Sequence, residues 1–221
     1  MSRSTRLVFG GHSIPYGYGT GPGIAGRVTQ PYPSQVLPLL GSPAYLKSHY
    51  QQDQVVNGPV NVAIGGRLIS DCLVTEWEVW RPDIACWDIG TNDITGGGAG
   101  MSNATADALA ASMVAAVAAK CTAILATSPT VRIIVGTIVT SGIWDAGQQR
   151  ARAGYNTSVL AGGLGNASRV TVCDPTVDSR LQTPSNATYF QADLLHFNNT
   201  GYGVHAIYWA AAIKASRALL P

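Results

Sequence analysis

The chain has 221 residues, enough for one domain with a sizeable hydrophobic core. Apolar residues make up 46% of it and charged residues only 12%, a globular composition that excludes an intrinsically disordered chain. The formal net charge is +2 and no run of basic residues is present, so nothing in the charge pattern supports a nucleic-acid partner.

Short apolar runs alternate along the chain with longer segments of helical spacing. Strands are expected at residues 5–10, 54–64 (strand, then turn), 83–89, 131–139 and 169–173. Helices are expected at residues 34–50, 68–79, 105–127, 148–160 and 201–219. Residues 11–33, rich in glycine, proline and tyrosine, are predicted to form a long loop, and residues 96–100 a flexible glycine loop.

This alternation of strands and helices predicts βαβ units with right-handed crossovers. The expected fold is an α/β class, three-layer α/β/α sandwich with a central parallel sheet of about five strands. No internal repeat or linker is visible, so residues 1–221 are expected to form a single domain. In such sheets a ligand binds beyond the carboxyl ends of the strands, which is where functional residues are to be sought.

No membrane span or export signal is predicted. The first apolar run, Leu7 to Phe9, is too short for the core of a secretory signal. The richest apolar stretch, residues 108–126, is interrupted by Ser112, Lys120 and Thr122 and is expected to be a buried helix. The chain as written is therefore expected to be soluble and leaderless. The compartment stays open, because a trimmed signal would leave the same sequence.

The cysteines predict neither a metal site nor disulfides. Cys72, Cys86, Cys121 and Cys173 lie far apart and lack the close pairing of metal ligands. We expect four buried free thiols and no metal.

The segment from Asp193 to His196 has the spacing of a catalytic acid–histidine pair. The carboxylate stands three residues before the imidazole, in what is expected to be a loop. A turn there lets Asp193 hold one ring nitrogen as a donor and leaves the other nitrogen free to take a proton. This is the base and its orienting group, and it requires a nucleophile from elsewhere.

Three further polar motifs follow expected strands. They are Gly10-Gly11-His12-Ser13, Asn61-Val62-Ala63-Ile64-Gly65-Gly66 and Gly90-Thr91-Asn92-Asp93. Taken alone, each is an ordinary turn or helix cap, because glycine, serine, asparagine and aspartate favour both. Taken together and in this order, they could meet at one edge of the sheet.

The four motifs together resemble those of the SGNH hydrolases, also called the GDSL esterase/lipase family. The resemblance runs from Val8 to Tyr202 and implies a flavodoxin-like fold. It implies that Ser13 is the nucleophile, with His196 as base and Asp193 as orienting acid. It further implies an oxyanion hole formed by Ser13, Gly66 and Asn92, with no cofactor and no metal. No G-x-S-x-G elbow occurs, which disfavours the larger α/β-hydrolase family.

The chain departs from the family pattern before the serine and in the second motif. His12 stands where the family usually has an aspartate, and Ala63 and Gly65 stand where it often has glycine and serine. His12 is expected first to form a hydrogen bond within its loop. Substrate contacts are expected from residues of the same loops, namely His12, Tyr16, Asp93 and Trp144.

The resemblance implies a serine esterase acting on short-chain carboxylic esters, with O-acetyl groups on carbohydrates as the first expectation. A lysophospholipase or arylesterase is the alternative enzyme. A non-catalytic carbohydrate-binding module of a structural assembly is the alternative from another class, although such a module would have no need of all four catalytic motifs. The oligomeric state, the acyl chain and the alcohol portion stay open.

Overall fold

A central parallel sheet organises the molecule. The computed structural model describes residues 5–17, 32–41, 60–61 and 63–221; the segments expected at 42–50 and 54–59, and residues 18–31 of the expected long loop, lie outside this range. The sheet has five strands in the order β2-β1-β3-β4-β5, all parallel. They are β1 (Leu7–Gly11), β2 (Val60–Asn61), β3 (Ile84–Asp88), β4 (Arg132–Gly136) and β5 (Val170–Cys173).

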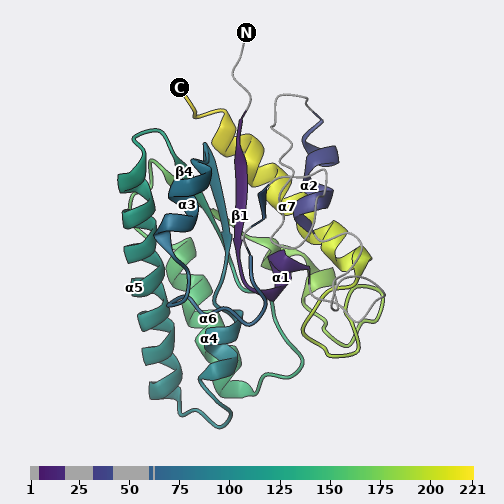
Figure 1. The fold of residues 1–221 in the computed structure, drawn as a ribbon. Helices are drawn as coiled ribbons and strands as arrows, with labels where there is room; N and C mark the ends of the chain where they lie inside the picture. Colours follow the sequence, from purple (N-terminus) through teal and green to yellow (C-terminus); the bar gives the residue numbers. More distant parts are fainter. Residues whose placement is uncertain (1–4, 18–31, 42–59, 62) are drawn as a thin grey trace.

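Helices cover both faces of this sheet (Figure 1). On one side lie α3 (Val74–Trp80), α4 (Thr91–Gly96), α5 (Asn103–Thr127) and α6 (Ala146–Leu160). On the other lie α2 (Tyr32–Leu40) and α7 (Asn199–Arg217), while the single-turn α1 (Ser13–Tyr16) follows β1 directly. Two short 3-10 turns, η2 (Pro175–Val177) and η3 (Ser179–Leu181), lead away from β5. The predicted three-layer α/β/α architecture is confirmed.

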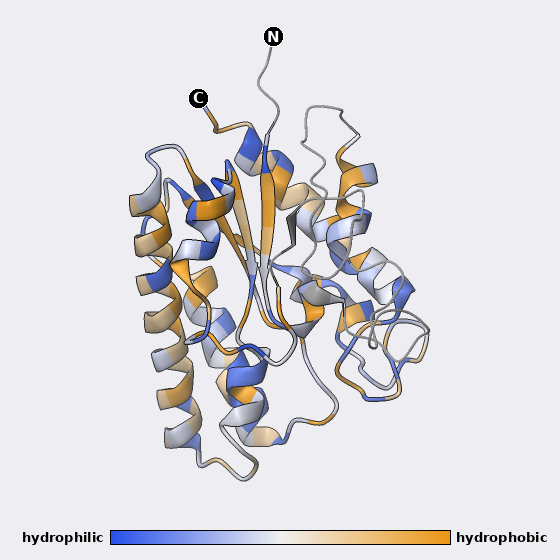
Figure 2. Ribbon diagram, viewed as in Figure 1, coloured by the Kyte–Doolittle hydropathy of each residue, from blue (hydrophilic) through white to orange (hydrophobic). Residues whose placement is uncertain are grey.

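The strands are apolar because both of their faces are buried (Figure 2). Successive side chains alternate between two hydrophobic clusters, one under each layer of helices. The cluster on the α5 side takes Val8, Ala85, Trp87, Ile133 and Val135. The cluster on the α7 side takes Leu7, Phe9, Ile84, Cys86 and Ile134. This continuous burial explains why each strand was recognisable as a short apolar run.

Helix α5 differs from one expectation. By length and composition alone it could cross a membrane, although the sequence suggested that no stretch was long enough. In the fold it packs against α6, α3 and β4, and its inward residues, among them Met113, Val117 and Cys121, belong to the hydrophobic core. It thus serves as a core helix, as its interrupted apolar pattern predicted.

Two expected segments are shorter or more structured than predicted. Residues 69–71 form a turn, not the start of the expected helix; the backbone N–H of Asp71 donates to the carbonyl of Leu68, and the Asp71 carboxylate accepts the N–H of Leu68. Helix α3 begins only at Val74. In the expected long loop, His12 accepts the N–H of Ile14 through its side chain, and one helical turn, α1, forms behind this cap.

All four cysteines are free and buried, as predicted. Burial raises the pKa of Cys72 to about 11 and that of Cys121 to about 12, so both remain neutral thiols. Within the described residues, no group of three or more histidine, cysteine, aspartate or glutamate side chains could hold a metal ion.

Strand order sets the place of a ligand site. From β1 the chain passes to β2 on one side, then crosses back to β3 on the other side of β1. The order of the strands therefore reverses between β1 and β3. In open α/β sheets the crevice at such a switch point, beyond the carboxyl ends of the strands, receives the ligand. The segments that leave β1 and β3 here carry Ser13 and Asn92.

Asn156 of α6 ties this helix to the chain that leaves β4. Its side chain is buried, accepts the N–H of Ile138 and donates to the carbonyl of the same residue, both at 2.8 Å. We predict that Asn156→Ala lowers the free energy of unfolding by about 2–4 kcal/mol, because the N–H of Ile138 loses its acceptor and its carbonyl keeps only the 3.5 Å contact with Arg152. Chemical denaturation measures the change.

Thr157→Ala is the matched control, since Thr157 is the next residue of the helix and is exposed. It should change stability by no more than about 0.5 kcal/mol. Equal effects of the two substitutions would contradict the role assigned to Asn156.

Candidate active site

The chain turns sharply between the end of β1 and Ser13. Gly11 has a φ of +135°, and a Cβ there would lie 1.7 Å from the carbonyl oxygen of Asp88 on β3. Only glycine permits so close an approach of the two strands. The turn places Ser13 as the first residue of α1, with 5% of its surface exposed. Its hydroxyl therefore sits at the switch point of the sheet.

Ser13 meets His196 and Asp193 in one hydrogen-bonded chain. The Nε2 atom of His196 lies 2.8 Å from the Oγ of Ser13, although the two residues are 183 positions apart. The Nδ1 atom of the same ring lies 2.7 Å from Oδ2 of Asp193. A carboxylate beside Nδ1 keeps the proton on that nitrogen, which leaves Nε2 as the acceptor that faces the hydroxyl.

Asp193 is held as a carboxylate. Burial by itself would raise its pKa, but the backbone N–H of His196, the imidazole of His196 and the backbone N–H of Leu195 all stabilise the charged form. The net effect is a lowered pKa. The group that orients the imidazole therefore stays ionised throughout the neutral range.

The loop that carries Asp193 and His196 is fixed to the chain after β4. The carbonyl of Leu194 accepts a hydrogen bond from the backbone N–H of Gly142 at 2.8 Å and another from the hydroxyl of Ser141 at 3.1 Å. Leu194 adopts a left-handed backbone with a φ of 58°, which is costly for a leucine. No sequence pattern indicated this docking, because Ser141 and Gly142 look like ordinary turn residues.

Asn92 lies in the first turn of α4, and Gly66 lies in the turn at residues 65–66. The Asn92 side chain donates one N–H to the carbonyl of Arg67 at 3.0 Å, and an amide nitrogen has a second N–H. Gly66 is exposed and left-handed, with a φ of +76°. The N–H of Ile64 binds the carbonyl of Gly11 at 3.1 Å and so joins this loop to the nucleophile strand.

Arg67 anchors the same loop to α3. Its side chain is largely buried and forms a two-pronged ion pair with Glu76, one contact of which measures 2.8 Å. No role was predicted for Arg67. An arginine directly after the Gly65-Gly66 pair was the available signal.

The residues expected to contact substrate lie in different surroundings. His12 is fully buried, and Trp144, only 7% exposed, donates its indole N–H to the hydroxyl of Thr95 at 3.0 Å. Both side chains are part of the protein interior, which contradicts the expectation that they line the site. Tyr16 ends α1, but its side chain lies outside the described part of the structure.

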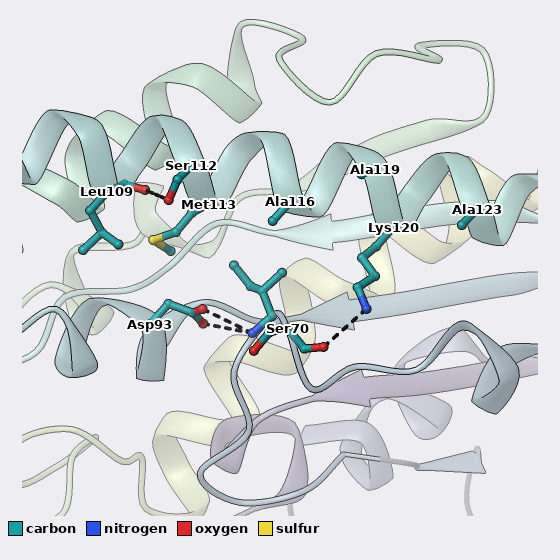
Figure 3. A pocket seen from close by; sticks show the side chains of 10 residues that line it. Ser70, Asp93, Leu109, Ser112, Met113, Ala116, Ala119, Lys120 and Ala123 are labelled. Carbon is teal, nitrogen blue, oxygen red and sulfur yellow. Dashed lines mark hydrogen bonds between the residues drawn. The ribbon is translucent and has the colours of Figure 1, made fainter.

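Asp93, the last of the expected substrate contacts, braces the neighbouring loop. Both of its carboxylate oxygens lie 3.2 Å from the backbone nitrogen of Ile69. Burial raises its pKa, and this hydrogen bond opposes the shift. Asp93 also borders a groove of about 380 Å³ along α5, which Figure 3 shows between Leu109 and Lys120. None of Ser13, His196 and Asp193 lines that groove.

Comparison with known proteins identifies the family of the chain. Residues 9–204 match the model of the GDSL-like Lipase/Acylhydrolase family, which is most of the chain. The chain belongs to this family. It is therefore an acylhydrolase, a carboxylic ester hydrolase, and the SGNH resemblance noted in the sequence is confirmed. No curated protein matches the acylhydrolase by sequence.

Several solved structures share its fold. A family 3 carbohydrate esterase of Clostridium thermocellum is 17% identical, with a TM-score of 0.68 over 99% of this chain and 100% of that one. A family 3 carbohydrate esterase of Talaromyces cellulolyticus is 19% identical, with a TM-score of 0.64 over 97% and 98%. An acetyl xylan esterase of Geobacillus stearothermophilus is 21% identical, with a TM-score of 0.60 over 96% of each chain.

The docking of the 193–196 loop on Gly142 can be tested. A Cβ at Gly142 would lie 2.9 Å from the Cβ of Leu194 and 3.2 Å from its Cδ1. We predict that Gly142→Ala displaces the loop and lowers kcat about tenfold or more for p-nitrophenyl acetate, because small displacements of a catalytic group are costly.

Gly96→Ala is the matched control, since a Cβ there meets nothing within 4 Å. It should leave kcat within about twofold and serves to separate a general glycine effect from the loop contact. An unchanged kcat in Gly142→Ala would show that the loop tolerates the displacement.

Proposed function

We propose that this acylhydrolase removes short acyl groups, acetyl before others, from the hydroxyls of carbohydrates, with Ser13 as nucleophile. The observation that carries the catalytic part is the chain of hydrogen bonds from Ser13 through His196 to Asp193, at 2.8 and 2.7 Å. The family establishes ester hydrolysis but not the residues that perform it or the substrate.

In the acylation half, the Oγ of Ser13 attacks the ester carbonyl carbon while its proton passes to Nε2 of His196. The resulting imidazolium is stabilised by the Asp193 carboxylate, whose lowered pKa keeps it charged. The tetrahedral intermediate then collapses. The C–O bond to the alcohol breaks, and that oxygen takes the proton from His196 Nε2 as it leaves.

The negative oxygen of the intermediate requires N–H donors. The proposed donors are the backbone N–H groups of Ser13 and Gly66 and the second amide N–H of Asn92. The first amide N–H of Asn92 donates to the backbone carbonyl of Arg67, and this hydrogen bond holds the Asn92 side chain in one orientation. Each well-placed donor to an oxyanion is typically worth about 3 kcal/mol of the barrier.

In the deacylation half, water replaces the alcohol. His196 removes a proton from the water as its oxygen attacks the acyl carbon, and the same proton returns to the Oγ of Ser13 when the ester bond breaks. The products are the free acid and the restored serine. Every proton transfer uses groups of the chain itself.

The substrate part rests on the solved structures with the same fold. Three of them bear the names of carbohydrate esterases or an acetyl xylan esterase, and all align over nearly the whole chain. The similarity in fold supports carbohydrate acetyl esters as the first substrate class to test. Lysophospholipid and aryl esters are the competing classes within the same chemistry. Membership of an acylhydrolase family favours an esterase over the alternative of a non-catalytic carbohydrate-binding module.

The nucleophile is tested by Ser13→Ala. This substitution should lower the turnover of p-nitrophenyl acetate by about 10⁴-fold or more, because the covalent path is lost. It should also abolish labelling by a fluorophosphonate while the melting temperature is retained. Ser112→Ala, at an exposed serine of α5, should leave both the turnover and the fluorophosphonate labelling unchanged. A Ser13→Ala protein with full turnover would refute the mechanism.

The acyl and alcohol portions are tested by two substrate series. We expect kcat/KM to be highest for the acetyl ester among p-nitrophenyl esters of two to twelve carbons, and to fall steadily with chain length. We also expect acetate release from acetylated xylan or O-acetylated amino sugars to be faster than fatty acid release from lysophospholipid. A maximum at long chains, or fatty acid release alone, would favour the lysophospholipase alternative.

A further inference from the structure

Behind Ser13 the sheet carries a second, buried acid–histidine pair. His12 directly precedes the serine and is 0% exposed, while Asp88, the last residue of β3, is 3% exposed. The Nε2 atom of His12 lies 3.6 Å from Oδ1 of Asp88, and the backbone N–H of His12 donates to the Asp88 carbonyl at 3.3 Å. The mechanism above uses neither side chain.

The two residues are forced together by the backbone. Gly11 pairs with Asp88 across β1 and β3, at the point where a Cβ would collide with the Asp88 carbonyl. Only glycine fits at position 11, and the next residue, His12, then lies beside the Asp88 carboxyl. The approach is therefore a consequence of the same glycine that shapes the nucleophile turn.

The hydrogen bonds of His12 define its tautomer. Its Nδ1 atom accepts the backbone N–H of Ile14 at 3.1 Å, so this nitrogen carries no proton. Burial first, and then the charges of His196 and His205, lower the pKa of His12 to about 3. The ring is accordingly neutral, and its one proton is on Nε2, the nitrogen that faces Asp88.

The Asp88 carboxyl sits in a costly position for a charge. Burial raises its pKa to about 7, and the hydroxyl of Tyr32 opposes the shift. The Nε2 of His12, at 3.6 Å, lies just beyond hydrogen-bond distance of one carboxyl oxygen. His205 of α7 approaches the other oxygen, with its Nε2 atom 3.8 Å from Oδ2. His205 is likewise buried, on α7.

We propose that His12 and Asp88 are positioning residues that act as one pair on the nucleophile. Asp88 keeps the proton of His12 on Nε2, and Nδ1 is thereby left as the acceptor that holds the N–H of Ile14 and fixes the backbone at Ser13. This inference rests on the proposed role of Ser13. The imidazole performs the capping task for which a side-chain carboxylate is a frequent choice at the start of a helix.

The pair also limits what residue 12 can be. An aspartate there could accept the same Ile14 N–H, but it would bring a second buried carboxyl beside Asp88. Two adjacent carboxyl groups away from water cannot both ionise readily, so one would be protonated or displaced. Residues 12 and 88 must therefore change together, and this dependence distinguishes a positioning pair from two unrelated buried side chains.

A double-mutant cycle over His12→Asp, Asp88→Asn and the two combined tests the dependence. We expect His12→Asp alone to lower kcat for p-nitrophenyl acetate about 100-fold with little change in KM, because the serine is misplaced. In the combined variant the amide introduced at position 88 can donate to the carboxylate introduced at position 12. The kcat of that variant should recover at least about tenfold over that of His12→Asp. Fluorophosphonate labelling rates should follow the same order.

A second pair of variants covers the case in which His12→Asp does not fold. His12→Asn keeps an acceptor for the Ile14 N–H and a donor for Asp88, so it should retain kcat within about fivefold, whereas His12→Ala should lose about 100-fold. His205→Gln is the control at the same carboxyl, and it should lower the melting temperature more than it lowers kcat.

The outcomes separate this inference from the proposed function. Independent, additive effects of His12→Asp and Asp88→Asn on kcat, or equal activities of His12→Asn and His12→Ala, would overturn the positioning pair while Ser13 remained the nucleophile. Full activity of Ser13→Ala would instead overturn the proposed function itself. A loss of melting temperature in step with kcat across all variants would assign His12 and Asp88 to stability alone.

Discussion

The hydrogen bond between Ser13 and His196 joins the two ends of the chain, and most of the structure serves to make it possible. The serine is delivered by the first strand of the sheet and the histidine by the last loop before α7. A parallel sheet makes this meeting feasible, since every strand releases the chain at the same edge. The sheet alone does not fix the distance between the two side chains. Three close contacts hold the segments that carry them: Gly11 against β3, Leu194 against the chain after β4, and the Ile64 N–H on the carbonyl of Gly11.

The sequence was sufficient to predict the fold class because the strands are buried on both faces. Runs such as residues 83–89 and 131–139 are short and mostly apolar, and they stand out from the longer helical segments between them. The pairing of Asp193 with His196 was also predictable, because three residues of spacing place both side chains in one turn. The meeting of this pair with Ser13 depended on topology, which the family resemblance supplied and local pattern could not.

The two wrong predictions of substrate contacts, at His12 and Trp144, have a common physical origin. His12 and Trp144 were expected near substrate because polar and aromatic residues in loops often face a ligand, yet Nδ1 of His12 accepts the N–H of Ile14 and the indole of Trp144 donates to Thr95, both inside the protein. Burial is set by contacts between segments distant in sequence, which single-residue chemistry does not reveal. Asp88 did leave a signal, since a carboxylate within the apolar run Ile84 to Ile89 demands a buried partner. The helix expected at residues 68–79 begins only at Val74, after a turn at residues 69–71.

The close passage of β1 beside β3 has a consequence for how relatives of this protein are recognised. Family signatures are usually written as consecutive letters, and the residue before the serine is one of those letters. Here the residue before the serine, His12, faces Asp88, which is distant in sequence but adjacent across the sheet. A signature that demands an aspartate before the serine would pass over this chain. One written as two complementary positions, an acceptor after the first strand and its counterpart at the end of the third, would retrieve it and would sort the family by the way each member braces its serine.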